Sequence, residues 1–289
     1  MTGPNVVAIG GGHGLAVSLR AIRTYARHVT AIVATSDDGG SSGRLRAELD
    51  MAAPGDLRRC LTALSDDPEL AAGLEHRFTA GQLAGHAVGN LVLAGLVDAG
   101  GDLLSAADQL SRWLGIDPAE ARVVPATRQP VAMVGTTATG EVRGQVAVEA
   151  TEGIVKVTTD PPDPVVPDAA TEAIAGADQV VLGPGSLFAS ILSAAAIPAV
   201  RAAVDRSEAT SVFVANLRAD EPGVAGFDVG RHLDVLAEHV VRVDVVVVQE
   251  DALPVGDVAG AKLVVADVDR PHGLAHDADL LGAVLAELA

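Results

Sequence analysis

Apolar residues along the chain alternate between short, Val-rich runs and longer stretches in which they recur every three or four positions. The first run, at residues 5–10, is followed by Leu15, Leu19 and Ile22, which have the spacing of an amphipathic helix. A second run at residues 29–35 completes a β-α-β unit, whose strands should be parallel and whose crossover should be right-handed. Later elements are expected as strands at residues 179–183, 211–217, 243–249 and 262–268, and as a terminal helix at residues 276–288.

The middle of the chain departs from this rhythm. Residues 57–115 have a mainly helical pattern, whereas residues 131–160 consist of short alternating runs with Gly-containing turns, which predict an antiparallel insert. The proline-rich residues 161–167 are typical of a linker. We therefore expect one α/β domain over residues 1–289. It should be Rossmann-like and doubly wound, with a mainly parallel sheet and the small antiparallel insert on its edge.

The amino-acid composition and net charge exclude several classes of protein. Of the 289 residues 49% are hydrophobic but only 2% aromatic, so the core must consist of Val, Leu, Ile and Ala. The net charge of -18 opposes binding to nucleic acids and anionic membranes. No apolar run approaches the ~18 residues of a membrane span and no signal peptide precedes the first strand, so we expect a cytoplasmic protein. The single cysteine, Cys60, excludes an internal disulfide and a cysteine-based zinc cluster.

A glycine-rich loop, "GGGHG", follows the first strand. Glycine allows backbone amides to approach a phosphate at the N-terminus of the next helix, and the histidine could donate to a phosphate oxygen. The alternative is a tight strand-to-helix turn with an exposed histidine. A dinucleotide fingerprint would need a third glycine where Leu15 stands, so NAD is not favoured. The candidate phosphate contacts in this loop are Gly11, Gly12, His13 and Gly14.

A second loop, "GPGS", repeats this arrangement after the strand at residues 179–183. Gly183 and Gly185 are candidate phosphate contacts, and Ser186 is a natural helix N-cap whose neighbouring amides also suit an anion. The loop lacks the lysine of a Walker motif, which excludes an ATPase of that type. Two such loops predict a ligand lying across the sheet edge, and a diphosphate fits. Asn216 begins a third loop, where it could bind a base or a sugar hydroxyl.

The stretch "SDDGGSSGRLR" follows the second strand. Asp37 and Asp38 lie at the carboxyl edge of the sheet, where they could hold Mg²⁺ or a sugar hydroxyl. The following residues form a Gly/Ser loop with amides and hydroxyls suited to an anion, and an arginine there would add a charged contact. The alternative is a solvated acid–base loop. The candidate anion contacts are Gly39, Gly40, Ser41, Ser42 and Arg44.

Two further segments carry candidate chemistry. In "PGDLRRCL", Asp56 could simply cap its helix, while Arg58 in the first turn could face the ligand. In "GHAVGN", His86 could be a general base or a phosphate donor, although a buried, hydrogen-bonded histidine is the commoner fate of a lone one. Asn90 in the same segment is a further candidate ligand contact.

Six segments in this order resemble the 2-phospho-L-lactate transferase (CofD-like) superfamily, and within it the gluconeogenesis-factor (YvcK-like) branch. They are "GGGHGL", "SDDGGSSGRLR", "PGDLRRCL", "GHAVGN", "LGPGSLFASI" and an "NL…GF" segment, and they span nearly the whole chain. Four residues depart from the usual pattern of the branch: His13 and Ala189 stand where threonine is usual, and Val224-Ala225 replaces an acid–hydroxyl pair in the third loop.

The resemblance implies a Rossmann-like fold, binding of a nucleotide sugar such as UDP-N-acetylglucosamine, a link to cell-wall synthesis and cell shape, and self-association into a homo-oligomer. The transferase relatives use Mg²⁺ to move a phospholactyl group from a nucleotide diphosphate-linked donor.

The residues leave several functions open. The leading hypothesis is a non-catalytic regulator that binds a UDP-sugar, because the chain is rich in phosphate-binding loops but lacks a convincing nucleophile and base. The alternative is a Mg²⁺-dependent transferase, with Asp37 and Asp38 holding the metal and His86 as base. A nicotinamide-dependent oxidoreductase is disfavoured by Leu15. A purely structural partner protein is the least favoured of the hypotheses.

Overall fold

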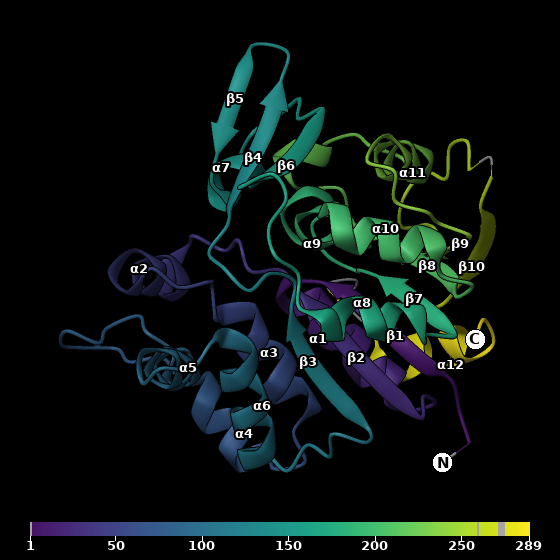
Figure 1. The fold of residues 1–289 in the computed structure, drawn as a ribbon. Coiled ribbons are helices and arrows are strands. Elements are labelled where there is room, and N and C mark those ends of the chain that lie inside the picture. The colour runs from purple at the N-terminus through teal and green to yellow at the C-terminus, as the bar shows by residue number, and fades with distance from the viewer. Residues whose placement is uncertain (1, 259, 271–274) are drawn as a thin grey trace.

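The large sheet of the protein has seven strands, all parallel, in the order β10-β9-β8-β7-β1-β2-β3. The computed structural model describes residues 2–258, 260–270 and 275–289 (Figure 1). Chain order reverses between β1 and β7, which makes this pair the switch point of the sheet. The strands are β1 Asn5–Gly10, β2 His28–Val33, β3 Ala121–Pro125, β7 Gln179–Leu182, β8 Thr210–Val214, β9 Val245–Gln249 and β10 Lys262–Ala266.

The predicted mainly parallel α/β fold is confirmed, and six of these strands overlap the expected runs. Strand β3 was not predicted. Its five residues, "ARVVP", are too few to stand out from the helical region before them.

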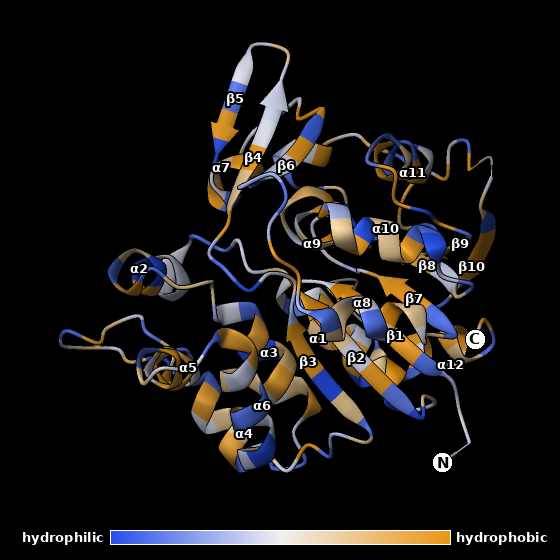
Figure 2. Cartoon of the chain, viewed as in Figure 1, coloured by the Kyte–Doolittle hydropathy of each residue, from blue (hydrophilic) through white to orange (hydrophobic). Residues whose placement is uncertain are grey.

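Helices cover both faces of the sheet because strand side chains alternate between two cores. In β1, Val6 and Ala8 point into one core, whereas Val7 and Ile9 point into the other. Figure 2 shows hydrophobic residues concentrated on the strands and on the helix faces against them. The first core packs against α1 Gly12–Ile22, α3 Gly55–Leu64, α5 Val88–Asp98, α6 Leu103–Trp113 and α12 Ala278–Ala286. The second packs against α8 Asp168–Ala175, η1 Leu187–Leu192, α9 Ser193–Ala195, α10 Pro198–Arg206 and α11 Val229–Glu238.

Two segments that the sequence predicts to be helical can be compared with the structure. The terminal helix is confirmed as α12, two residues shorter at each end than expected. The helical region at residues 57–115 is confirmed as most of α3, together with α4 Pro68–Glu75, α5 and α6.

The Gly/Ser segment after β2 is a helix and not the loop that its composition predicts. Helix α2 spans Gly40–Leu49, so both serines lie in its first turn. Tertiary contacts override the weak propensity of its sequence. Leu45 is buried in the core, and the Arg46 guanidinium donates to the backbone oxygen of Ser36 at 2.8 Å and of Val131 at 2.6 Å.

The antiparallel insert is a separate three-stranded sheet with the order β5-β4-β6. Its strands are β4 Ala132–Thr137, β5 Gly140–Arg143 and β6 Lys156–Asp160, and the β4–β5 hairpin projects from the body of the molecule (Figure 1). A short helix that the sequence pattern did not predict, α7 Gln145–Glu149, lies between β5 and β6 and packs against η1. Residues 161–167 contain no helix or strand, as expected of a linker.

Within the described residues, no single helix is long and apolar enough to cross a membrane. Two helical segments, Leu187–Ala195 and Pro198–Arg206, reach the required length and composition only together, and they are bent by 74°. Their apolar side chains belong to the second core.

Candidate functional site

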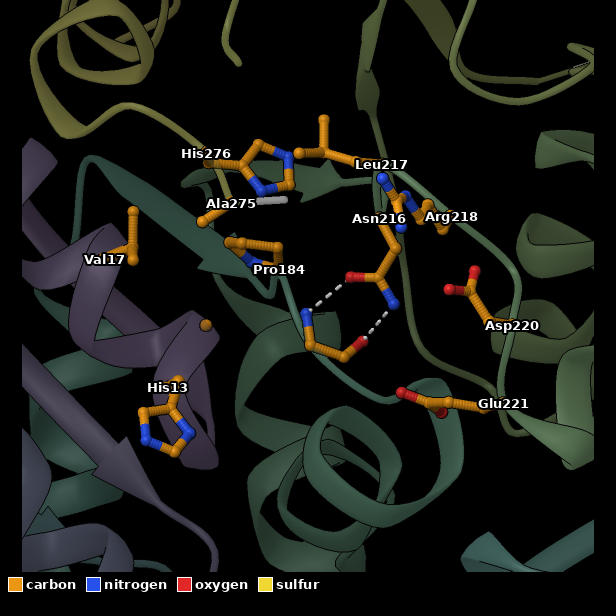
Figure 3. A pocket seen from close by; sticks show the side chains of 12 residues that line it. His13, Val17, Pro184, Asn216, Leu217, Arg218, Asp220, Glu221, Ala275 and His276 are labelled. Atoms are coloured by element: carbon orange, nitrogen blue, oxygen red, sulfur yellow. Dashed lines mark hydrogen bonds between the residues drawn. The ribbon is translucent and has the colours of Figure 1, made fainter. Parts of the chain in front are cut away.

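Two neighbouring hollows lie at the switch point, beside the carboxyl ends of β1 and β7. The wide hollow has a volume of about 540 Å³, and apolar side chains of Val17, Pro184 and Leu217 form part of its wall (Figure 3). The acidic hollow has a volume of about 360 Å³. Ligands of open α/β sheets bind at this kind of position. Both hollows are lined by His13, Gly14, Gly185 and Glu221.

The first glycine loop leads into helix α1, and the first turn of this helix lines both hollows. The first-turn amides of a helix have no partner within the helix, so they are available to other acceptors. Here the buried Asp56 carboxylate accepts from the Gly12 amide, although Asp56 belongs to α3. The expectation that Asp56 caps its own helix is therefore wrong: the N-cap of α3 is Pro54, and no side chain bonds there.

The second glycine loop is held by its neighbours on both sides. Asn216 Oδ1 accepts from the Gly185 amide at 2.9 Å, and Asn216 Nδ2 donates to the Gly185 carbonyl at 3.0 Å (Figure 3). Ser186 Oγ accepts from the Ala189 amide at 3.2 Å, which confirms Ser186 as an N-cap, here of the π-helix η1. Ser186 also hydrogen-bonds the Glu221 carboxylate. The loop is thus preorganised, and Asn216 lines the wide hollow while it holds the loop.

Four carboxylates surround the acidic hollow: those of Asp37, Asp56, Glu149 and Glu221. Burial raises the pKa of Glu149, and the charges of Glu221, Asp37 and Asp56 raise it further. Burial also raises the pKa of Glu221, against the hydrogen bond from Ser186. Such a wall can accept hydrogen bonds from sugar hydroxyls or attract a cation, but it repels a bare phosphate.

Two basic groups face these carboxylates. Arg59 Nη1 lies 2.5 Å from Asp56 Oδ1, and it opposes the burial that raises the pKa of Asp56. His13 lies between the two hollows, and burial together with the charge of Arg59 lowers its pKa. A mostly neutral histidine here can donate one hydrogen bond without adding a full charge.

The two adjacent aspartates do not converge on one point. Asp37 faces the acidic hollow, and its Oδ1 accepts from the Gly39 amide at 2.9 Å. The Asp38 carboxylate instead accepts from the first two amides of α7, Gln145 at 3.1 Å and Val146 at 3.0 Å. Gly144 makes this approach possible, because a Cβ there would lie 2.2 Å from Asp38 Oδ2. Among the described residues, no group of three or more His, Cys, Asp and Glu side chains is arranged to hold a metal ion.

Four of the predicted site residues form a buried network behind the hollows. Asn90 Nδ2 donates to Ser41 Oγ at 3.0 Å, and Ser41 Oγ lies 3.0 Å from His86 Nδ1. Arg58 Nη1 donates to Asn90 Oδ1 at 2.9 Å and also forms an ion pair with Glu75. Burial lowers the pKa of His86, and the charge of Arg44 lowers it further. None of these residues lines either hollow, so the network joins α2, α3, α4 and α5 and gives the region its shape.

The remaining predicted site residues also divide into those that line the hollows and those that lie elsewhere. Arg44 is directed away from both hollows, where its Nη2 donates to the Ala84 carbonyl at 2.9 Å. The buried Ser42 packs beside Gly55, where a Cβ would lie 2.3 Å from its hydroxyl. The predicted residues brought together at the hollows are Gly11, Gly12, His13, Gly14, Asp37, Gly185, Ser186 and Asn216, while Asp38, Gly39, Gly40, Ser41, Ser42, Arg44, Arg58, His86, Asn90 and Gly183 lie outside their lining.

Sequence reasoning missed several residues of the lining. Arg59 lies beside the predicted Arg58, and Arg218 and Glu221 lie in the third loop, whose charged residues after a strand were an available signal. Glu149 had no such signal, because it comes from α7 in the insert, and the insert's position over the sheet edge follows only from the folded chain.

Known proteins share this architecture over nearly the whole chain. The sequence is 42% identical to the "Putative gluconeogenesis factor" of Mycobacterium tuberculosis, over 97% of this chain and 89% of that protein. It is 38% identical to the "Gluconeogenesis factor" of Halalkalibacterium halodurans, over 89% and 80%. A crystal structure of a UPF0052 family member from Bacillus halodurans superposes with a TM-score of 0.93, at 32% identity and 99% coverage of both chains.

The sequence profile of one protein family covers the same extent. The profile described as 2-phospho-L-lactate transferase CofD matches residues 6–278, a range that includes both glycine loops and every residue named above in the acidic hollow. The chain therefore belongs to the CofD family.

Proposed function

We propose that the protein is a gluconeogenesis factor that binds a nucleotide sugar of the UDP-N-acetylglucosamine type and acts as a regulator of cell-wall synthesis and cell shape. One observation carries the ligand class: two glycine loops, each joining a strand to a helix, pack against one another at the switch point, and both line the two adjoining hollows. The names of the similar proteins support the gluconeogenic role.

The chemistry of the hollows matches the parts of such a ligand. A flat base would pack in the wide hollow against Val17, Pro184 and Leu217. The diphosphate would lie at the junction, near the His13 and Gly14 amides in the first turn of α1, because the Gly12 and Gly185 amides already bond Asp56 and Asn216. The sugar would enter the acidic hollow, where Asp37 and Glu149 can accept from its hydroxyls.

A regulator is favoured because the candidate base does not line the proposed ligand site. His86, proposed from the sequence as a general base, lies outside the lining of both hollows and bonds Ser41. Catalysis by proton transfer requires the base within hydrogen-bond reach of its substrate.

One observation favours a second candidate function, a Mg²⁺-dependent transferase acting on a nucleotide diphosphate-linked substrate. Among the residues that the structure describes, four carboxylates and only one arginine line the acidic hollow, so a diphosphate there would need a cation to offset the repulsion. Asp37 and Glu149 offer oxygen ligands of the kind that Mg²⁺ prefers, whereas Asp38 is committed to α7. A bound Mg²⁺ would neutralise charge on the departing phosphate.

Product analysis separates the two functions. The protein is incubated with UDP-N-acetylglucosamine, with and without Mg²⁺, and phosphorus NMR follows the diphosphate resonances. A regulator leaves them unchanged while the ligand is bound; cleavage that requires Mg²⁺ identifies a transferase. The family resemblance also predicts a homo-oligomer, and sedimentation velocity tests that part of the proposal.

A further inference from the structure

A separate cavity of about 240 Å³ lies between the antiparallel insert and helices α10 and α11. Over the described ranges of the chain, it shares no lining residue with either hollow of the candidate site. Strand β6 forms one wall, the end of η1 and the start of α10 form another, and the end of α11 closes it. We call it the insert cavity.

Two cationic side chains line the insert cavity, in a protein with 20 Lys and Arg residues against 38 Asp and Glu residues. Lys156 comes from β6 and Arg201 from α10, and within the described part of the chain neither has an acidic partner. Both charges act on the same neighbour, because each adds to the burial that lowers the pKa of His239. The acid at the cavity, Glu238, already accepts from Arg231 Nη1 at 2.8 Å.

The histidine at the cavity is already bonded to the backbone through both ring nitrogens. His239 Nε2 accepts from the Val157 amide at 2.9 Å, so its proton is on Nδ1, which donates to the Val235 carbonyl at 2.7 Å. Both ring nitrogens are thus used in a neutral ring. The start of α10 adds the positive potential of a helix N-terminus, because Ile197 and Pro198 line the cavity and no side chain caps the helix.

The rim of the cavity contains a strained apolar residue. Val240 has a φ of 58°, a conformation that β-branched residues rarely adopt, and its side chain is 59% exposed. Its amide bonds the Ala237 carbonyl, as in a helix end where glycine is usual. Strain of this kind collects at ligand sites, and Val240 lines the same cavity as Lys156 and Arg201.

We propose that the insert cavity binds a small phosphate-bearing anion, held by Lys156 and Arg201 beside the N-terminus of α10. Two cations and a helix N-terminus are the groups that proteins use for phosphate. The volume lies below the roughly 300–1,000 Å³ of sites for drug-sized ligands, so the ligand has few atoms. The apolar rim favours a phosphate monoester over inorganic phosphate. The proposal does not depend on the function of the candidate site.

Hydrogen-exchange mass spectrometry tests this proposal, because it shows which segments of the chain an anion protects. The full-length protein is titrated at constant ionic strength with inorganic phosphate, with glycerol 3-phosphate, and with acetate as a control anion. We expect either phosphate probe to slow exchange in β6 and in the first turn of α10, with the ester acting at the lower concentration. Stronger action of inorganic phosphate would identify the free ion as the ligand.

Two double variants complete the test. In Lys156→Gln/Arg201→Gln the apparent affinity should fall by at least about tenfold. The matched variant Lys262→Gln/Arg206→Gln removes the same amount of charge outside the cavity and should keep the apparent affinity of the unmodified protein. The proposal is overturned if neither probe protects β6 and α10 in the unmodified protein, or if both double variants respond alike. Exchange without ligand shows whether each variant is folded.

Discussion

Asn216 binds the backbone of Gly185 through both ends of its side-chain amide, at 2.9 and 3.0 Å. The pair joins the loop after β8 to the loop after β7, at the boundary of the two hollows. A residue expected to contact the ligand directly thus also fixes the backbone that would receive the phosphate.

Replacing Asn216 by Ala removes both hydrogen bonds. Each is worth about 0.5–1.5 kcal/mol net, so the free energy of unfolding should fall by about 1–3 kcal/mol in urea denaturation. Affinity for UDP-N-acetylglucosamine should fall as well, because the loop at Gly185 is no longer held. Asn5→Ala is the matched control for affinity, because it also removes a side-chain hydrogen bond to backbone but lies outside both hollows, so its affinity for the UDP-sugar should not change. Unchanged stability in Asn216→Ala would show that the loop needs no such support.

Arg59 and Arg44 should respond differently to the same substitution. Arg59 lines the acidic hollow, whereas Arg44 donates to Ala84 outside it. Arg59→Gln should weaken binding of UDP-N-acetylglucosamine by about tenfold or more, from the loss of one charged contact. Arg44→Gln should leave the affinity nearly unchanged, although the sequence had suggested Arg44 as the phosphate contact. Calorimetric titration measures both, and the reverse order would place the diphosphate next to α2.

Asp38 should act through α7 and not on the ligand. Its carboxylate accepts from the first two amides of that helix, and α7 carries Gln145 and Glu149 into the acidic hollow. In Asp38→Ala the α7 amides should exchange faster with deuterium, because a helix cap contributes about 0.5–2 kcal/mol. In Asp37→Ala the exchange of α7 should stay as it is. Equal exchange in the two variants would mean that α7 is held by its other contacts.

Stability should fall on mild acidification because of buried histidines. Burial lowers the pKa of His239 below its ordinary value of 6.5, against the hydrogen bond to Val235. The unfolded chain therefore binds the proton first as the pH falls, so this contribution is complete above about pH 6.5 and declines below it. His239→Gln should flatten the dependence of the unfolding free energy on pH between about 7 and 5. His28→Gln is the control. If the unfolding free energy of His239→Gln depended on pH as steeply as that of His28→Gln, the assignment to His239 would be contradicted.

The fold was predictable where the sequence carries a periodic signal. The Val-rich runs mark six strands of the large sheet, and the glycine loops mark where two of them end. Helix α2 was missed because Gly40, Ser41 and Ser42 have low helix propensity, and only packing of Leu45 and the bonds of Arg46 make the segment helical.

The candidate site was predictable as a location more than as a set of contacts. The loops after β1 and β7 meet because parallel strands end at the same edge. Which of Arg58 and Arg59 faces the hollow depends on the rotation of α3, and the apolar pattern around Leu57 and Leu61 does not fix it. The separation of Asp37 from Asp38 depends on α7, more than 100 residues away in the chain.

The central claim is that a nucleotide sugar binds at the switch point, and calorimetric titration with UDP-N-acetylglucosamine tests it most directly. His13 lies between the hollows, and His13→Asp would place a carboxylate where the diphosphate is proposed to lie, while a negative charge in the first turn of α1 suits the helix. We predict micromolar binding to the unmodified protein, loss of binding in His13→Asp, and no comparable binding of NAD. No binding of the UDP-sugar, or equal binding to the variant, would contradict the account.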